Sequence, residues 1–238
     1  MYEKRLVLVM NSYSILLIYA HPDDETVFTG GLISQCVFKG KEVYLISATR
    51  GEAGKTSGLC TREQLSKVRE EELREAAKIL GIKDIIFLGY SDGKLNEVNQ
   101  LEITQRIAAI IRRIRPDIIV TFGPDGATGH KDHKAIHVFA SEAVSIAGEQ
   151  KCESIAGKVF KVPKVYYVAL ATKIKKAWAI HEESPEPDTV ICVKQYSNIK
   201  MKALKCHKTQ ALSFEKFFNV DRDILQRFLE EETFRWAK

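Results

Sequence analysis

Two short segments combine histidine and aspartate at spacings that suit metal-assisted hydrolysis. Residues 20–25 read AHPDDE, and residues 129–133 read GHKDH. Imidazole nitrogen and carboxylate oxygen together form a ligand set that suits zinc (Zn²⁺). A catalytic zinc site takes three protein ligands and leaves one position open for water. The sequence therefore predicts a zinc centre, provided that the two segments meet in space.

The two segments contain enough groups for three ligands and a base. His21 and His133 would supply two ligands. Either Asp23 or Asp24 would supply the third. The other aspartate is then free to act as general base on water, whose pKa a bound zinc lowers to about 7.

The second segment also offers two assisting groups. His130 could donate to a developing oxyanion or protonate a leaving amine. Asp132 could accept a hydrogen bond from an imidazole and so fix its tautomer. Either segment alone could be a polar turn that caps a helix, but two such segments in one chain favour a metal site.

The first segment directly follows a short apolar run at residues 15–19, and the second follows another run at 118–122 after a loop that contains Gly123 and Gly126. Both runs are typical of strands buried on both faces. Further strands are predicted at 43–46 and 85–88. The predicted helices lie at about 26–39, 61–80, 101–114 and 132–147. This alternation predicts an α/β fold, a Rossmann-like doubly wound and mostly parallel sheet with helices on both faces. In the order 3-2-1-4-5, strands one and four are neighbours, so both segments would reach the ligand crevice.

The last third of the chain is less regular. We expect strands at 165–168 and 190–193 and helices at 196–212 and 221–232. Because no repeat or Ser/Gly-rich linker interrupts the chain, we predict a single domain over 1–238. Its core spans about 14–147 and holds the metal site, and 148–238 form a C-terminal elaboration. The acidic run 70–72 and His207 are expected on solvated helix faces.

The composition excludes several classes of protein. Of the 238 residues, 45% are hydrophobic and 28% are charged, as in a globular protein. The net charge is +5, but the excess over 151–216 is all lysine, which argues against a nucleic-acid partner. No apolar run reaches the roughly 18 residues of a membrane span. The apolar run at 6–10 is soon interrupted by polar residues, so we expect no signal peptide. Without a cysteine framework either, the expected location is cytoplasmic.

Three motifs in this order resemble a known family. AHPDDE, TRGEAG at 49–54 and the GHxDH element are similar to those of the zinc-dependent N-acetylglucosaminyl deacetylases known as LmbE-like or PIG-L-like. The resemblance covers residues 14 to about 140 and continues weakly at 202–204 and 207–210. It implies a hydrolase that removes acetyl from a small amino-sugar substrate. By analogy, it also implies a homo-oligomer, a trimer or hexamer.

Alternatives to this function stay open at the level of sequence. An amidase of thiol conjugates would use the same site. A non-catalytic metal-binding module on a Rossmann-like sheet would use the ligands alone.

The resemblance also implies roles for individual residues. The implied set comprises metal ligands His21, Asp24 and His133, general base Asp23, oxyanion donor or acid His130, orienting Asp132, and substrate-binding Arg50 and Asp92. Gly51 and Gly54 suggest that the loop around Arg50 closes on a ligand. Two departures from the family pattern are Lys131, where a proline is usual, and the lack of tyrosine at 127–128. Neither removes a ligand.

Overall fold

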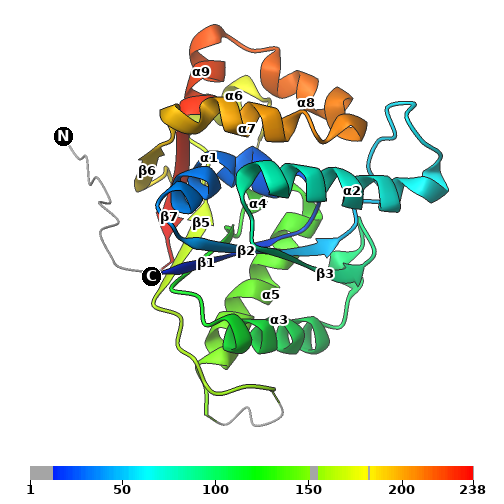
Figure 1. The fold of residues 1–238 in the computed structure, drawn as a ribbon. Coiled ribbons are helices and arrows are strands. Elements are labelled where there is room, and N and C mark those ends of the chain that lie inside the picture. The colour runs from blue at the N-terminus through cyan, green and yellow to red at the C-terminus, as the bar shows by residue number, and fades with distance from the viewer. Residues whose placement is uncertain (1–12, 151–154, 182, 238) are drawn as a thin grey trace.

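The computed structural model describes residues 13–150, 155–181 and 183–237 (Figure 1). They form one seven-stranded sheet of order β3-β2-β1-β4-β5-β7-β6. The strands are β1 Ser14–Tyr19, β2 Glu42–Thr49, β3 Asp84–Tyr90, β4 Ile118–Phe122, β5 Lys164–Val168, β6 Thr189–Cys192 and β7 Glu231–Trp236. Neighbouring strands from β3 to β5 pair in parallel, whereas β7 pairs antiparallel with both β5 and β6. The predicted order 3-2-1-4-5 and the α/β class are confirmed.

Helices cover both faces of the sheet, as Figure 1 shows. One face carries α1 Asp24–Phe38 and α2 Arg62–Leu80, and the other carries α3 Gln100–Ile114 and α5 Lys131–Ala147. The short α4 Gly126–Gly129 precedes α5. The C-terminal helices are α6 Thr172–Ala177, α7 Ser197–Leu204, α8 Ala211–Phe218 and α9 Arg222–Glu230. Of these, α7 packs on α1 and α2 as an outer layer.

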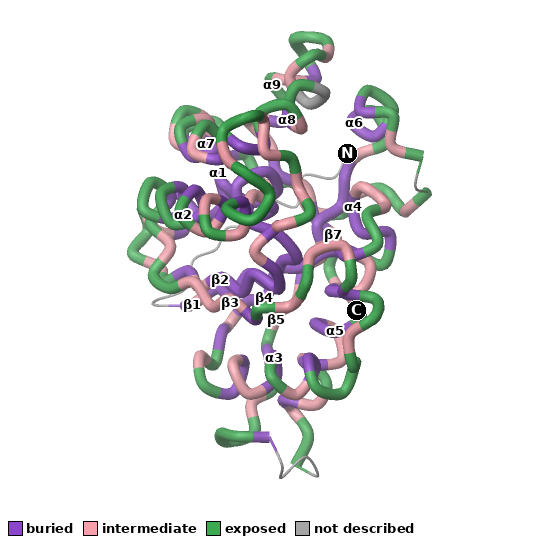
Figure 2. The backbone as a smooth tube through the Cα atoms, turned by 90° about the vertical axis from the view of Figure 1, so that its right-hand side faces the viewer, coloured by how far each residue is buried: buried purple, intermediate pink, exposed green. Residues whose placement is uncertain are grey.

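The core lies around the central strands, which are buried on both faces (Figure 2). Leu16, Leu17, Ile18 and Tyr19 of β1 all have 0% exposure. Capping residues set the ends of α2, as the sequence predicts. The Thr61 N–H donates to Gln64 Oε1 at 3.1 Å, which forms one half of a capping box. These parts of the fold are therefore fixed by local sequence and by burial of apolar runs.

The C-terminal third departs from the expected elements. The predicted helix over 196–212 is divided into α7, a 3-10 turn over Lys208–Gln210, and α8. The predicted helix over 221–232 ends at Glu230, and the chain continues as β7. Glu232 explains this change, because its buried carboxylate accepts the backbone N–H groups of Gly31 and Leu32, each at 2.8 Å. It also pairs with buried Lys200 Nζ at 2.9 Å, so tertiary contacts override local propensity.

The structure tests the predictions about membrane spans and a signal peptide only in part. Among the described helices, none is both long and apolar enough to cross a bilayer. The expectation about a signal peptide falls on residues that lie almost entirely outside the described part of the chain.

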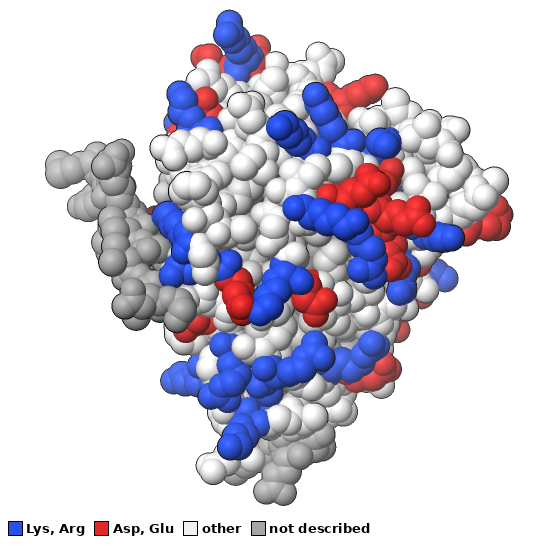
Figure 3. All heavy atoms as spheres, viewed as in Figure 1, with Lys and Arg blue, Asp and Glu red and all other residues white. Residues whose placement is uncertain are grey.

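Figure 3 shows basic and acidic side chains close together over the upper helices, and a band of basic side chains lower on that face, around α3.

Candidate active site

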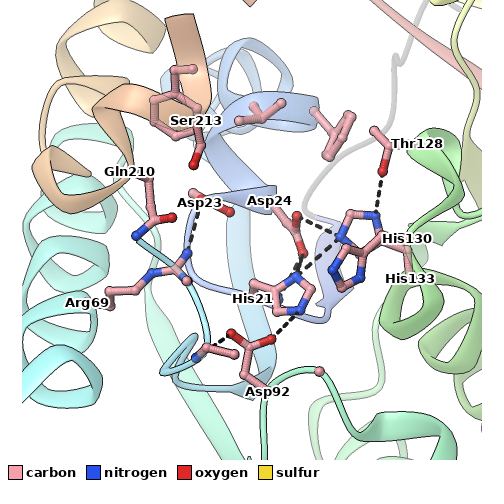
Figure 4. A pocket seen from close by; sticks show the side chains of 16 residues that line it. His21, Asp23, Asp24, Arg69, Asp92, Thr128, His130, His133, Gln210 and Ser213 are labelled. Atoms are coloured by element: carbon pink, nitrogen blue, oxygen red, sulfur yellow. Dashed lines mark hydrogen bonds and ion pairs between the residues drawn. The ribbon is translucent and has the colours of Figure 1, made fainter. Parts of the chain in front are cut away.

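The two chemistry-bearing segments meet at the carboxyl ends of β1 and β4, as predicted. A cavity of about 300 Å³ opens there. Figure 4 shows Asp23 and Arg69 on one side of the cavity and His130 and His133 on the other. Its polar lining comprises His21, Asp23, Asp24, Arg69, Asp92, Thr128, His130, His133, Gln210 and Ser213.

Three of these residues place ligand atoms around one point. His133 Nε2 lies 3.3 Å from His21 Nδ1 and 3.2 Å from Asp24 Oδ1. Asp24 Oδ2 lies 3.5 Å from His21 Nδ1. Tetrahedral ligands at roughly 2.0–2.1 Å from one zinc ion are roughly 3.3 Å from each other. The spacing of these atoms therefore fits a single metal ion between them.

The other nitrogen of each imidazole faces a partner that accepts a hydrogen bond. His21 Nε2 faces Asp92 Oδ1 at 2.9 Å and Asp132 Oδ2 at 3.2 Å. His133 Nδ1 faces the carbonyl oxygen of Gly126 at 3.0 Å. Each imidazole in its neutral form therefore turns a lone pair toward the other and toward Asp24. A cation would stabilise lone pairs that converge in this way. Carboxylates and carbonyl oxygens on the far ring nitrogen commonly orient metal-binding histidines.

The charges of the site give its acidic groups different pKa values. Burial alone raises the pKa of Asp24, but His133 and His21 outweigh it and hold that pKa well below its usual range. Burial opposes protonation of His21, yet Asp132, Asp24 and Asp92 raise its pKa well above the ordinary value. An anionic Asp24 between two imidazoles is the state that a metal ligand requires.

Asp132 and Asp92 reach His21 from different elements. Asp132 is fully buried at the start of α5, and it accepts the N–H groups of Gly93 at 2.6 Å and Leu95 at 3.2 Å. Asp92 lines the cavity and accepts the Ala53 N–H at 3.0 Å. The structure brings both residues to the site. It places Asp132 as a partner of His21, and Asp92 as both such a partner and a wall of the cavity.

Asp23 lies beside the proposed ligands but faces a different partner. Its Oδ2 accepts a hydrogen bond from Arg69 Nη2 at 3.0 Å. Burial raises the pKa of Asp23 to about 6, although Arg69 acts to lower it. Its backbone has φ 112°, which is unusual for a residue other than glycine. The structure therefore holds a carboxylate in a strained conformation at the cavity wall.

Arg69 is a site residue that the sequence interpretation missed. It is only 3% exposed, and it also donates from Nη1 to the Gly51 carbonyl at 2.7 Å. A signal was present, because Arg69 lies four residues from both Leu65 and Leu73 on the apolar stripe of α2. A charged residue on a buried helical stripe indicates a specific partner.

The glycines of the TRGEAG segment make room for Arg69. A Cβ added at Gly51 would lie 2.1 Å from Arg69 Nη1, and one at Gly54 would lie 2.6 Å from the same atom. The loop was expected to close on a ligand. In the structure it packs against the Arg69 guanidinium and also lines the cavity at Gly54, so closure on a ligand stays a prediction.

Arg50 is not among the residues that line the cavity, and its substrate-binding role stays a prediction. Its Nε donates to Glu70 Oε2 at 2.6 Å, and its guanidinium lies 5.1 Å from the ring centroid of Phe87.

The acidic run 70–72, expected on a solvated helix face, is not wholly exposed to solvent. Glu72 is buried and accepts the backbone N–H and the hydroxyl of Thr209.

His130 stands next to the ligand triangle rather than within it. One of its ring nitrogens lies within 4.8 Å of nitrogens of His21 and His133. Its Nδ1 accepts the Asp132 N–H at 3.2 Å, so the neutral ring carries its proton on Nε2. Burial and the charges of the two other histidines lower its pKa. Lys131, at the usual proline position, is exposed and begins α5.

The fold and the site define a doubly wound α/β protein with a His–Asp–His metal centre at its switch point. Residues 16–144 match the PIG-L family, described as GlcNAc-PI de-N-acetylase. The chain therefore belongs to the PIG-L family, and the predicted class of hydrolase is confirmed.

Named relatives agree with this assignment. The chain is 30% identical to the 1D-myo-inositol 2-acetamido-2-deoxy-alpha-D-glucopyranoside deacetylase of Rhodococcus jostii (strain RHA1), over 94% of this chain and 91% of that protein. It is 31% identical to the probable N-acetyl-alpha-D-glucosaminyl L-malate deacetylase 2 of Bacillus anthracis, over 84% and 82%. The N,N'-diacetylchitobiose deacetylase of Pyrococcus horikoshii has the same fold, with a TM-score of 0.77, 22% identity, and coverage of 94% and 84%.

Proposed function

We propose that the protein is a zinc-dependent N-deacetylase that hydrolyses the acetamide of a small N-acetylglucosaminyl compound. The observation that carries the proposal is the triangle of His21 Nδ1, His133 Nε2 and the Asp24 carboxylate, with atoms 3.2–3.5 Å apart. Asp23 borders the same cavity. The names of the relatives support an N-acetylglucosaminyl substrate.

Two groups would activate the water molecule: a bound zinc ion and the carboxylate of Asp23. His21, Asp24 and His133 would hold the zinc ion, which would supply a water of pKa about 7 and polarisation of a carbonyl oxygen. Asp23 accepts a proton from the attacking water. Its pKa of about 6 suits a base that must also release that proton. Arg69 holds one oxygen of the Asp23 carboxylate at 3.0 Å and so limits its rotation.

His130 stabilises the charge that develops on the substrate. Its hydrogen bond from the Asp132 N–H leaves the Nε2 proton for the carbonyl oxygen of the acetamide as that oxygen becomes negative. Protonated Asp23 then delivers its proton to the departing amine as the C–N bond breaks. The products are acetate and the free amino sugar, which balances the addition of one water.

The sugar is proposed to lie against Asp92. Its Oδ1 faces His21, and its Oδ2 accepts the Ala53 N–H. A carboxylate has about four lone-pair positions, so both oxygens keep capacity for sugar hydroxyls. The homo-oligomer and the cytoplasmic location stay predictions.

The test is release of primary amine and acetate from a panel of N-acetylglucosaminyl conjugates, with inositol, malate and a second sugar as aglycones. Release should stop with a chelator and return with added zinc. The panel also includes thiol-conjugate amides that lack N-acetylglucosamine. If only these are cleaved, the proposed substrate is wrong. If no member reacts with protein that holds stoichiometric zinc, the proposed activity is wrong.

A further inference from the structure

A buried carboxylate and a buried imidazole lie directly behind Asp23. Glu25 has 0% exposure, and His207 has 1%. His207 Nε2 lies 3.2 Å from Glu25 Oε1. His207 was expected on a solvated helix face, but the structure buries it between α7 and the 3-10 turn over Lys208–Gln210. Neither Glu25 nor His207 takes part in a step of the proposed reaction.

Glu25 holds the backbone of Asp23. The Asp23 N–H donates to Glu25 Oε2 at 3.0 Å. The Asp23 carbonyl accepts from the N–H groups of Thr26 and Val27, at 3.0 and 2.9 Å. A residue other than glycine keeps a φ of 112° only when its surroundings enforce it. The hydrogen bond to Glu25 is the contact that satisfies the amide in this conformation.

His207 in turn holds Glu25. Its Nε2 also lies 3.3 Å from Thr26 Oγ1, and that hydroxyl donates to Glu25 Oε1. Two donors therefore fix one oxygen of Glu25 while the other receives the Asp23 amide. His207 Nδ1 has no hydrogen-bond partner among the described residues. The ring thus makes its polar contacts on the side that faces Glu25 and Thr26.

We propose that Glu25 and His207 are positioning residues that fix Asp23 in its strained conformation and so aim its carboxylate at the reacting water. The inference rests on the proposed function, in which Asp23 is the base. Arg69 restrains the carboxylate end of Asp23, and the Glu25–His207 pair restrains its backbone. A merely structural role would instead affect the whole fold and every catalytic group equally.

A double-mutant cycle distinguishes these two roles. We expect Glu25→Ala to lower kcat about 100-fold in the otherwise unchanged enzyme, because small misplacements of a reacting group have effects of this size. In an Asp23→Asn background the same substitution should change kcat by no more than about two-fold, since it acts through Asp23. Equal losses in both backgrounds would overturn the proposal. Glu25→Gln keeps an amide oxygen for the Asp23 N–H and should restore most of the rate.

Glu72→Ala is the matched control. Glu72 is also a buried carboxylate that holds the C-terminal segment, through Thr209, but none of its hydrogen bonds goes to Asp23 or Glu25. Its effect on kcat should be the same factor in both backgrounds. If Glu25→Ala does not fold, His207→Phe takes its place in the cycle, because it removes the donor to Glu25 and keeps a ring.

A second measurement needs no substrate. In the metal-free protein, Glu25→Ala should speed hydrogen exchange of the Asp23 amide at least 10-fold relative to the amides of β1, whereas Glu72→Ala should not. Zinc affinity, measured by calorimetry, should stay within about two-fold, because the ligand atoms are untouched. Unchanged exchange at Asp23 would overturn the proposal even if the enzyme hydrolysed none of the substrates. Failure of the proposed function alone would leave this exchange result intact.

Discussion

At the scale of single residues, two adjacent carboxylates have opposite environments. Asp24 lies between His21 and His133, which hold its pKa well below the usual range against the effect of burial. Burial raises the pKa of Asp23 to about 6. Such a separation marks one group as a permanent anion and the other as a proton acceptor. These environments support the proposed roles of Asp24 as metal ligand and Asp23 as general base, between which spacing alone did not choose.

Asp23→Asn tests this division. The variant should bind zinc as the wild type does, because Asp23 contributes no atom to the ligand triangle. Its kcat should fall at least about 100-fold, the usual effect of losing a general base. Steady-state kinetics and metal analysis of the same preparation measure both quantities. A near-wild-type kcat would show that another group is the base.

Asp132→Ala tests the support of the metal centre. Asp132 Oδ2 lies 3.2 Å from His21 Nε2, and loss of such a partner typically weakens metal binding 10–100-fold. We therefore expect zinc affinity to fall by about 10-fold or more, as measured by competition with a chelator. Asp117→Ala is the control, because that carboxylate accepts the Ser14 N–H at the opposite end of β1. Equal affinity in the two variants would contradict the role given to Asp132.

At the scale of elements, the loop that follows β2 packs against the guanidinium of Arg69 in α2. Gly51→Ala adds a Cβ that meets the buried guanidinium, whereas a Cβ at Gly58 meets nothing within 4 Å. Both glycines have nearly equal positive φ, 71° and 73°, so backbone strain is matched.

We therefore expect Gly51→Ala to lower kcat about 10-fold or more by displacing Arg69 from Asp23. Gly58→Ala should lose only stability, about 1 kcal/mol. Kinetics and thermal unfolding of both variants measure this difference. A similar kcat for the two variants would show that the position of Arg69 does not affect catalysis.

The central elements could be predicted because local signals and burial agree. The apolar runs of β1 and β4 and the capping box at Thr61 each indicate one structure. The same agreement brought His21, Asp24 and His133 together, since His21 and Asp24 follow the end of β1 and His133 lies in the first turn of α5, the helix that follows β4. β7 could not be predicted, because its sequence is polar and the partners of buried Glu232 are distant in sequence: Lys200 of α7 and the backbone of Gly31 and Leu32 in α1. Arg69 and His207 were missed for the same reason: their partners are distant in sequence.

At the scale of the whole molecule, a buried ion pair joins the loop after β4 to α6. Lys175 Nζ lies 3.0 Å from Asp125 Oδ2, and both side chains are at most 6% exposed. Burial opposes ionisation of Asp125, but the bond from Lys175 outweighs it and lowers its pKa below the ordinary value of 3.8. This pair therefore contributes stability above pH 4 that is lost as the pH falls below the ordinary pKa.

Asp125→Asn should accordingly destabilise the protein at pH 7 by about 3 kcal/mol, because it removes the carboxylate charge that faces the buried ammonium of Lys175. The difference from the wild type should shrink at pH 3, where the wild-type carboxylate also begins to lose its charge. Urea unfolding of chelator-treated protein at both pH values measures this. Asp221→Asn, at an exposed position before α9, is the control. A difference that does not depend on pH would contradict the pairing.

The separation of Glu25 from His207 by 182 positions has a consequence for biosynthesis. The proposed metal ligands all lie at or before residue 133, so the ribosome synthesises them first. The imidazole that braces the base emerges much later. During translation the proposed metal ligands are therefore synthesised before His207, the residue proposed to fix Asp23 through Glu25. On this proposal, the full rate of hydrolysis is reached only when the last third of the chain has docked and His207 lies against Glu25.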